Sequence, residues 1–245
     1  MIKERKYTLT ADLLNGLKQN AIKNATSLLQ EAKILLSQRM WARAYFLACV
    51  SIEESGKAFI AFNSVNRNLS DPAVQHVLKM ELENHGTKSI MGLSSLMRQG
   101  GTDPKHIDYF LQLNLHLYAG REKSLYVDIN DDTTLTLPET LVRPEAASDS
   151  VRLSEHSLAA TIEYIANNPP KTFSAHDDKS YTISKKSGVR KMMDTTDFWD
   201  FYVDVMTSMQ NNLEDSLSVA ISRYWDEYYS KGKCWGGVQS LPEGH

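Results

Sequence analysis

Apolar residues recur every three or four positions along most of this chain, the spacing of helices that bury one face. Thr10 and Asp12 precede the first such segment, which predicts a helix over roughly residues 10–37. The next segment, residues 40–66, is apolar on most of its circumference and belongs inside a bundle. Because the break between the two is so short, we expect an antiparallel helical hairpin.

Proline opens three further periodic segments, where it suits the first helical position. The predicted helices cover roughly residues 72–99, 104–126 and 144–167. The threonine-rich stretch 127–142 alternates polar and apolar residues in part, which predicts a short extended piece or hairpin arm. The remainder is predicted as a loop at 171–193, a long aromatic-rich helix at 195–230 and a flexible tail from 232 to 245.

These elements predict an all-α protein. We expect an up-and-down bundle of four to five long helices over residues 1–170. A C-terminal extension, residues 171–245, carries the further long helix and is expected to pack on the bundle.

The composition is that of a globular protein. Of the 245 residues, 42% are hydrophobic, enough for a core, and the net charge of -3 argues against attraction of the whole protein to nucleic acid. A local basic run in the predicted loop is interpreted either as solvated surface or as a phosphate-binding edge. It comprises Lys179, Lys185, Lys186, Arg190 and Lys191.

Localisation signals point to the cytoplasm. The two cysteines, Cys49 in the central apolar helix and Cys234 near the end, form no disulfide framework and indicate a reducing compartment. The N-terminus lacks the apolar core of a secretory signal. No apolar run approaches the roughly 18 residues of a membrane span, so no membrane association is expected.

Charge in the middle of the central helix is the main functional clue, because burying an unpaired charge is costly. Glu54 follows Leu47 and Ser51 at a spacing of three to four residues, which predicts that Glu54 points inward. Glu53 and Lys57, four residues apart, are predicted to form a same-helix ion pair at the rim. Gly56 in mid-helix suggests the close approach of another helix or a ligand.

Two other predicted helices carry polar groups on their apolar stripes. His85 is followed by Lys88 one turn later, and Arg121 by Tyr126 and Asp128. Each alone is ordinarily structural, but together they could converge, with Glu54 beside Arg121 as a buried ion pair. Neither a metal site nor a cofactor is expected, since no phosphate loop, HExxH or CxxC motif is present.

Several of these stretches, within residues 10–130, resemble the AbiV family of abortive infection proteins. They are Ala42-Arg43-Ala44-Tyr45, Ile52 to Ala58 with its Glu-Glu-Ser-Gly-Lys core, His85 with Lys88, and Arg121 to Asp128. That family is placed among the HEPN helical bundles of prokaryotic defence. The resemblance implies a helical bundle, often a homodimer, that acts against phage.

The resemblance leaves two kinds of function open. Many HEPN proteins are metal-independent ribonucleases with an Arg-x4-His motif, but here Tyr126 stands where the histidine would be. Imidazole exchanges protons near neutral pH more easily than a phenol does. We therefore expect a protein that binds a phage or host component and interrupts phage development or translation. The alternative is an RNase that uses Arg121, His85 and Tyr126 for catalysis.

In either case, the expected binding residues are Glu53, Glu54, Lys57, Lys88 and Asp128. In the RNase, Lys57 or Lys88 would stabilise negative charge.

Overall fold

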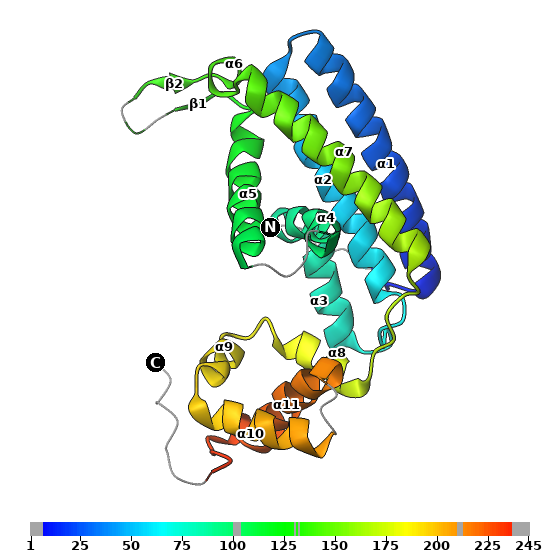
Figure 1. The fold of residues 1–245 in the computed structure, drawn as a ribbon, viewed down its shortest axis with the longest axis vertical. Coiled ribbons are helices and arrows are strands. Elements are labelled where there is room, and N and C mark those ends of the chain that lie inside the picture. Colours follow the sequence, from blue (N-terminus) through cyan, green and yellow to red (C-terminus); the bar gives the residue numbers. More distant parts are fainter. Residues whose placement is uncertain (1–6, 100–103, 130, 132, 210–212, 237–245) are drawn as a thin grey trace. The chain divides into compact units, whose positions relative to one another are not determined.

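The computed structural model describes residues 7–99, 104–129, 131, 133–209 and 213–236. Helices dominate them, and this confirms the predicted all-α class (Figure 1). The chain forms two compact units. The first unit comprises Met1–Val65 and Leu78–Lys171, and the second comprises Asn66–Val77 and Thr172–His245.

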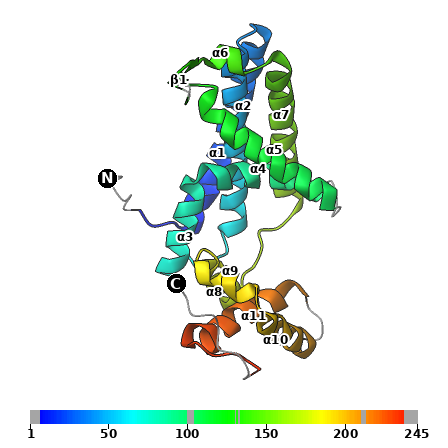
Figure 2. The same cartoon turned by 90° about the vertical axis from the view of Figure 1, so that its left-hand side faces the viewer.

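The first unit is built around α2 (Trp41–Ser64), which packs against α1 (Ala11–Ser37), α4 (His85–Gln99), α5 (Pro104–Lys123) and α7 (Pro144–Asn167). Thr10 caps α1, its Oγ1 accepting from the backbone N–H of Leu13 at 3.1 Å. The helix bounds predicted for α1, α2 and α7 are confirmed to within a few residues. Figure 2 shows α5 crossing the direction of α7 obliquely.

Alanines and serines let these helices approach closely. On one side of α2, the core that joins it to α1 and α7 contains Ala25, Ala32, Ala44 and Ala48. Buried hydroxyls bond across the helix contacts: Ser51 Oγ donates to the carbonyl oxygen of Ala25 at 2.9 Å. Because such hydrogen bonds satisfy buried polar groups, tight packing here leaves few of them unpaired.

On its other side α2 meets α4 and α5 through a second apolar cluster. Cys49, Ile52, Leu93 and Leu117 form its buried part. Cys49 is a buried free thiol, as expected from the sequence. Burial raises the pKa of Cys49 to about 12, so it stays protonated and is no nucleophile at neutral pH.

The helix predicted over residues 72–99 is two helices, and this prediction is wrong. α3 (Pro72–Glu83) ends before Asn84, and α4 begins at His85. The reason is local capping: Asn84 Oδ1 accepts from the backbone N–H of Thr87 at 2.8 Å. His85 therefore opens a helix rather than interrupting the stripe of a longer one.

The predicted hairpin arm is confirmed. β1 (Asp128–Ile129) pairs antiparallel with β2 (Leu135–Thr136), with Ile129 opposite Leu135. A single helical turn, α6 (Pro138–Leu141), connects the hairpin to α7. The side chains of Val127, Ile129 and Leu135 are exposed to solvent.

The second unit has its own aromatic core. Its helices are α8 (Ala175–Ile183), α9 (Ser187–Met193), α10 (Thr196–Ser208) and α11 (Leu213–Glu227), followed by the 3-10 turn η1 (Tyr229–Lys231). Phe198, Phe201 and Tyr224 are the largest buried side chains in this core. The rings of Phe198 and Tyr224 meet edge to face at 5.5 Å.

Three predictions fail in this unit. The predicted loop 171–193 contains α8 and α9, and α8 begins with a capping box in which Ser174 and Asp177 bond each other's backbone N–H groups. The predicted long helix is split into α10 and α11. The tail is not frayed at Trp235 and Gly236, whose backbone N–H groups each donate to Asp197 at 2.8 Å. Residues 237–245 of the predicted tail lie outside the described residues.

Candidate functional site

A buried carboxylate organises the polar groups of the first unit. Only 5% of the Glu53 side-chain surface is exposed, yet cationic groups from two other helices reach it. Its Oε2 lies 2.7 Å from Nδ1 of His85 and 3.6 Å from Nζ of Lys88, both on α4. Its Oε1 lies 2.8 Å from Nε of Arg121 on α5. Glu53 thereby joins three helices of the bundle through one functional group.

Two glycines bring α4 close enough for these contacts. A Cβ built at Gly56 would lie 1.8 Å from the carbonyl oxygen of Lys88, and one at Gly92 would lie 2.2 Å from that of Ile52. The backbones of α2 and α4 therefore touch where only glycine fits. This confirms the close helix approach predicted from Gly56, and it sets His85 and Lys88 over Glu53.

The prediction for the two glutamates is reversed in the structure. Glu53, not Glu54, is the inward group that meets Arg121. Glu54 pairs instead with Lys57, one turn away on the same helix. The face count failed because α2 is buried on nearly all sides, so apolar residues alone did not mark the side that meets α4 and α5. Glu53 follows Cys49 by one turn, on the side packed against Leu93 and Leu117.

Lys88 is a buried counter-charge. Burial lowers the pKa of Lys88, while the nearby Glu53 carboxylate acts in the opposite direction. The ammonium lies among carboxylates and Lys57 rather than in solvent. Its contact with Glu53 therefore helps to balance a charge that would otherwise be costly to bury.

Arg121 is held from three sides. Its Nε faces Glu53, its Nη1 lies 3.6 Å from the exposed carboxylate of Glu122, and its guanidinium carbon lies 5.5 Å from the ring centre of Phe46. Nε contacts Glu53 by distance, without the angle of a hydrogen bond. The Arg121 side chain is 16% exposed, and this residue lines a pocket.

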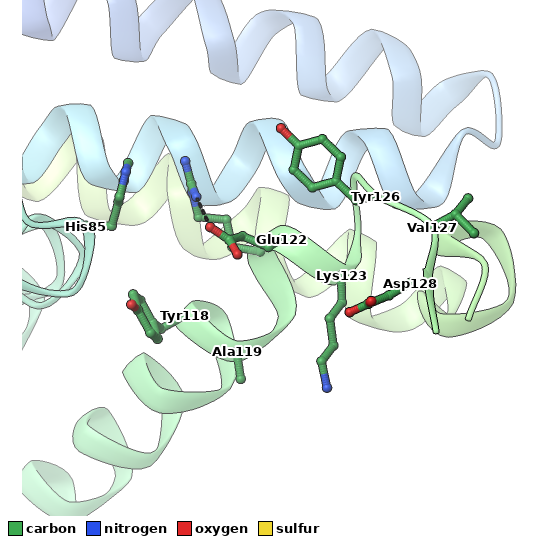
Figure 3. Close-up of a pocket in the computed structure, with 9 residues that line it drawn as sticks. His85, Tyr118, Ala119, Glu122, Lys123, Tyr126, Val127 and Asp128 are labelled. Atoms are coloured by element: carbon green, nitrogen blue, oxygen red, sulfur yellow. Dashed lines mark ion pairs between the residues drawn. The ribbon is translucent and has the colours of Figure 1, made fainter. Parts of the chain in front are cut away.

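A pocket of about 390 Å³ opens next to Arg121 (Figure 3). His85, Arg121, Tyr126 and Asp128 line it, so four of the predicted site residues come together. His85 remains 46% exposed at its side chain, and Tyr126 is also exposed. The other predicted binding residues do not line the pocket: they are Glu53, Glu54, Lys57 and Lys88. Glu53 nevertheless contacts two residues that do line it, His85 and Arg121.

Three lining residues with functional groups were missed from the sequence: Tyr118, Glu122 and Lys123. Tyr118 lies one helical turn before Arg121, a spacing that could have marked it. A Cβ at Gly86 would lie 3.8 Å from the Tyr118 ring, so this ring borders the start of α4. Figure 3 shows His85, Tyr118 and Glu122 around the same hollow.

The pocket is open, but its charges are balanced. Arg121 and Lys123 are offset by Glu122 and Asp128. A phosphate group would therefore be recognised locally by the guanidinium, rather than by a strongly positive surface. Within the described residues, no three histidine, cysteine or carboxylate side chains gather as a metal site would require.

The described helices include none with the length and hydropathy needed to cross a membrane.

Comparison with curated proteins found no match, and neither did comparison with solved structures. A family model does match: the HEPN family AbiV, over residues 13–159. This match covers more than half of the chain and includes every helix that contributes to the Glu53 cluster. The chain therefore belongs to the AbiV family of HEPN-like proteins, a membership that indicates a role in abortive infection, a defence against phage.

Proposed function

We propose that this protein defends against phage by binding RNA in the pocket beside Glu53 and cleaving it without a metal. One observation carries the proposal: a single buried carboxylate contacts both His85 and Arg121, and both of these line the same open pocket. A proton-transfer group and a phosphate-binding group are thereby fixed beside a space that a nucleotide can enter.

The Glu53–His85 contact defines the role of the imidazole. With Glu53 ionised, Nδ1–H donates to Oε2, and this fixes the tautomer that leaves Nε2 as an acceptor. Such an imidazole can take a proton from a hydroxyl group. His85, from another helix, thus supplies the function that histidine has in the Arg-x4-His motif.

The proposed reaction is an internal transesterification. Nε2 of His85 takes the proton of the ribose 2′-hydroxyl, and the 2′-oxygen forms a bond to phosphorus. The bond from phosphorus to the 5′-oxygen breaks, and Tyr126 gives its phenolic proton to that leaving oxygen. The products are a 2′,3′-cyclic phosphate and a 5′-hydroxyl, with Arg121 neutralising the phosphoryl oxygens in the transition state. Proton return from His85 to Tyr126 through water completes the cycle.

The test is single-turnover cleavage of single-stranded RNA by purified protein in excess chelator. His85→Ala should reduce the rate about 100-fold or more, the range of general acid–base catalysis. His116→Ala is the matched control, since His116 is an exposed histidine on α5 that does not line the pocket. Equal rates for His85→Ala and wild type would exclude His85 as the base. No cleavage by the wild type would exclude the nuclease.

Arg121 needs a conservative variant, because truncation would also remove the cation that faces Oε1 of the buried Glu53 carboxylate. Arg121→Lys keeps the positive charge but loses the planar donor set, and we expect cleavage to fall about 100-fold. Arg152→Lys, at an exposed arginine paired with Asp149 on α7, is the control and should leave cleavage unchanged. If both variants cleave equally, Arg121 does not bind the phosphate.

A second candidate is a non-enzymatic protein contact, supported by exposed apolar side chains beside the pocket. They are Tyr118, Tyr126, Val127, Ile129 and Leu135. Exposed apolar groups gathered in this way are typical of interaction sites. The partner is a phage or host protein, or a second copy of this chain in a homodimer.

Light scattering of wild type and of Ile129→Asp tests the homodimer. A wild-type mass of one chain would exclude the dimer, whereas loss of a dimer in the variant would support it.

A further inference from the structure

A second charged feature lies in the other unit, on α8 and α9. Between Asp178 and Asp194 the sequence contains no acidic residue, although it contains five cationic ones. Lys185, Lys186, Arg190 and Lys191 are exposed. Lys179 lies on α8, and its Nζ is 3.1 Å from Asp226. Arg190 and Lys191 lie on α9, whereas Lys185 and Lys186 lie in the short turn between α8 and α9.

Acidic residues follow the basic run, and the first of them, Asp194, is the C-cap of α9. The acidic residues Asp197, Asp200 and Asp204 follow on α10. Asp197 is already engaged by the Tyr224 hydroxyl and by the backbone of Trp235 and Gly236. Among the described residues, no carboxylate pairs with Arg190 or Lys191. These two cations are therefore available to an outside anion.

Aromatic packing fixes the start of α9. The Trp225 ring stacks on Tyr229 with a centroid separation of 5.4 Å, and Lys186 Nζ lies 5.2 Å from the centre of the Trp225 ring. A Cβ at Gly188 would approach both rings to 3.2 Å. The cationic segment is therefore held against a rigid aromatic surface, and a bound anion would not have to order a mobile loop.

An exposed tryptophan is fixed beside the end of α9. Trp199 Nε1 donates to the carbonyl oxygen of Met193, the last residue of α9, at 2.7 Å. Phe198 and Tyr202 meet its ring edge to face at 5.1 and 5.7 Å. Trp199 is nevertheless 43% exposed as a residue. Proteins that bind single-stranded nucleic acids stack bases on aromatic side chains and neutralise phosphates with nearby cations. Trp199, held in one orientation near Arg190 and Lys191, offers both kinds of contact.

We propose that this surface, which comprises Lys185, Lys186, Arg190, Lys191 and Trp199, binds single-stranded nucleic acid. An anionic membrane is the less suitable partner, because Val189 and Met192 are buried in the core of the unit, so the cationic helix α9 does not present these apolar side chains for insertion. The proposal does not depend on RNA cleavage at the pocket of the first unit.

The first test measures binding of the full chain to a fluorescent single-stranded RNA by anisotropy at several salt concentrations. Arg190→Gln with Lys191→Gln should weaken binding about ten-fold near physiological salt and reduce the slope of log K against log salt by about 1.4, that is about 0.7 for each phosphate that is no longer neutralised. Lys23→Gln, at an exposed lysine on α1, is the control for an unrelated change of charge and should alter neither quantity. An unchanged salt slope in the double variant would overturn the proposal.

Thermal unfolding of each variant separates binding from helix stability. Both cations lie in the last turn of α9, where positive charge favours the helix. If they serve only α9, the double variant melts earlier and binds RNA as the wild type does, and the proposal fails.

The second test isolates base stacking. Trp199→Ala should weaken binding to single-stranded RNA about ten-fold, whereas Trp199→Phe keeps a ring and should lose less. Binding of a duplex of the same sequence should not change in either variant, because paired bases cannot stack on the indole. Equal losses on single strand and duplex would contradict a stacking role.

Two further arms separate this proposal from its alternatives. Loss of cleavage in His85→Ala would not count against the surface, because the two tests above measure binding and its salt slope rather than cleavage. Vesicles of phosphatidylserine and phosphatidylcholine test the membrane. If Arg190 and Lys191 are needed for vesicle binding and not for RNA binding, the nucleic-acid proposal is wrong.

Discussion

Oε2 of Glu53 on α2 lies 2.7 Å from Nδ1 of His85, the first residue of α4. The carboxylate is buried, but the imidazole reaches the pocket. The same carboxylate faces Arg121 and Lys88. Glu53 is therefore a positioning residue: it holds the groups that would meet a substrate without lining the pocket itself.

The two adjacent glutamates should differ in their importance for stability. Glu53→Gln removes the buried counter-charge that faces both Arg121 and Lys88, and we expect it to lower the free energy of unfolding by about 3 kcal/mol. Glu54→Gln removes only a same-helix pair with Lys57, and about 1 kcal/mol or less should be lost. Urea denaturation measures both. A larger loss in Glu54→Gln would return the inward role to Glu54.

The helix crossing at Gly56 should not tolerate a methyl group. In Gly56→Ala the new Cβ would meet the backbone of Lys88, and a backbone cannot rotate away as a side chain can. Overpacking of this kind costs about 1–3 kcal/mol, or more where a backbone must move. The shift of α4 should also displace His85 and weaken any activity at the pocket.

Gly16→Ala is the matched control for that substitution. Gly16 lies within α1, and a Cβ there would meet nothing within 4 Å. Because alanine favours helix by about 1 kcal/mol over glycine, this variant should be as stable as the wild type or more so. If Gly56→Ala stabilises the protein by the same amount, α2 and α4 are not in backbone contact.

The stability of the second unit should depend on pH through Asp197. Burial alone would raise the pKa of Asp197, but hydrogen bonds from the Tyr224 hydroxyl and the backbone N–H groups of Gly236 and Trp235 outweigh it and lower the pKa below its ordinary 3.8. Just below pH 3.8 the unfolded chain then binds more protons than the folded one, so falling pH favours unfolding. The stability contributed by the carboxylate is present above pH 3.8 and disappears below it.

Asp197→Asn removes this titration. The difference in stability between wild type and Asp197→Asn should be largest near neutral pH and should shrink as the pH falls below 3.8. Asp200→Asn, at an exposed aspartate on the same helix, should show no such change. A difference that stays constant down to acidic pH would mean that the tail is not held by the Asp197 carboxylate.

The sequence predicted the bundle well where helices are long and have a clear start or stop. Thr10 marked α1, and the prolines at the starts of α5 and α7 marked those helices. The prediction failed where a short local interaction determines where a helix starts or ends. The Asn84 cap splits one periodic segment into α3 and α4, and the capping box of Ser174 and Asp177 starts a short helix inside a polar stretch.

The candidate site was predicted in its members but not in its arrangement. His85 and Arg121 stood out on apolar stripes, Tyr126 stood out as the residue in the place of the motif histidine, and all three line one pocket. The choice between Glu53 and Glu54 depends on which side of α2 faces α4 and α5. That side is set by the Gly56–Lys88 backbone contact, a tertiary feature that periodicity along one helix does not contain.

The central claim, that the pocket organised by Glu53 carries the defence function, is tested most directly by plaque counts on cells that express the protein. Wild type and His116→Ala should reduce plaques equally. His85→Ala should abolish protection at an equal level of folded protein, because it removes the pocket imidazole and leaves the bundle intact. If His85→Ala protects as well as the wild type, the pocket is not the functional site.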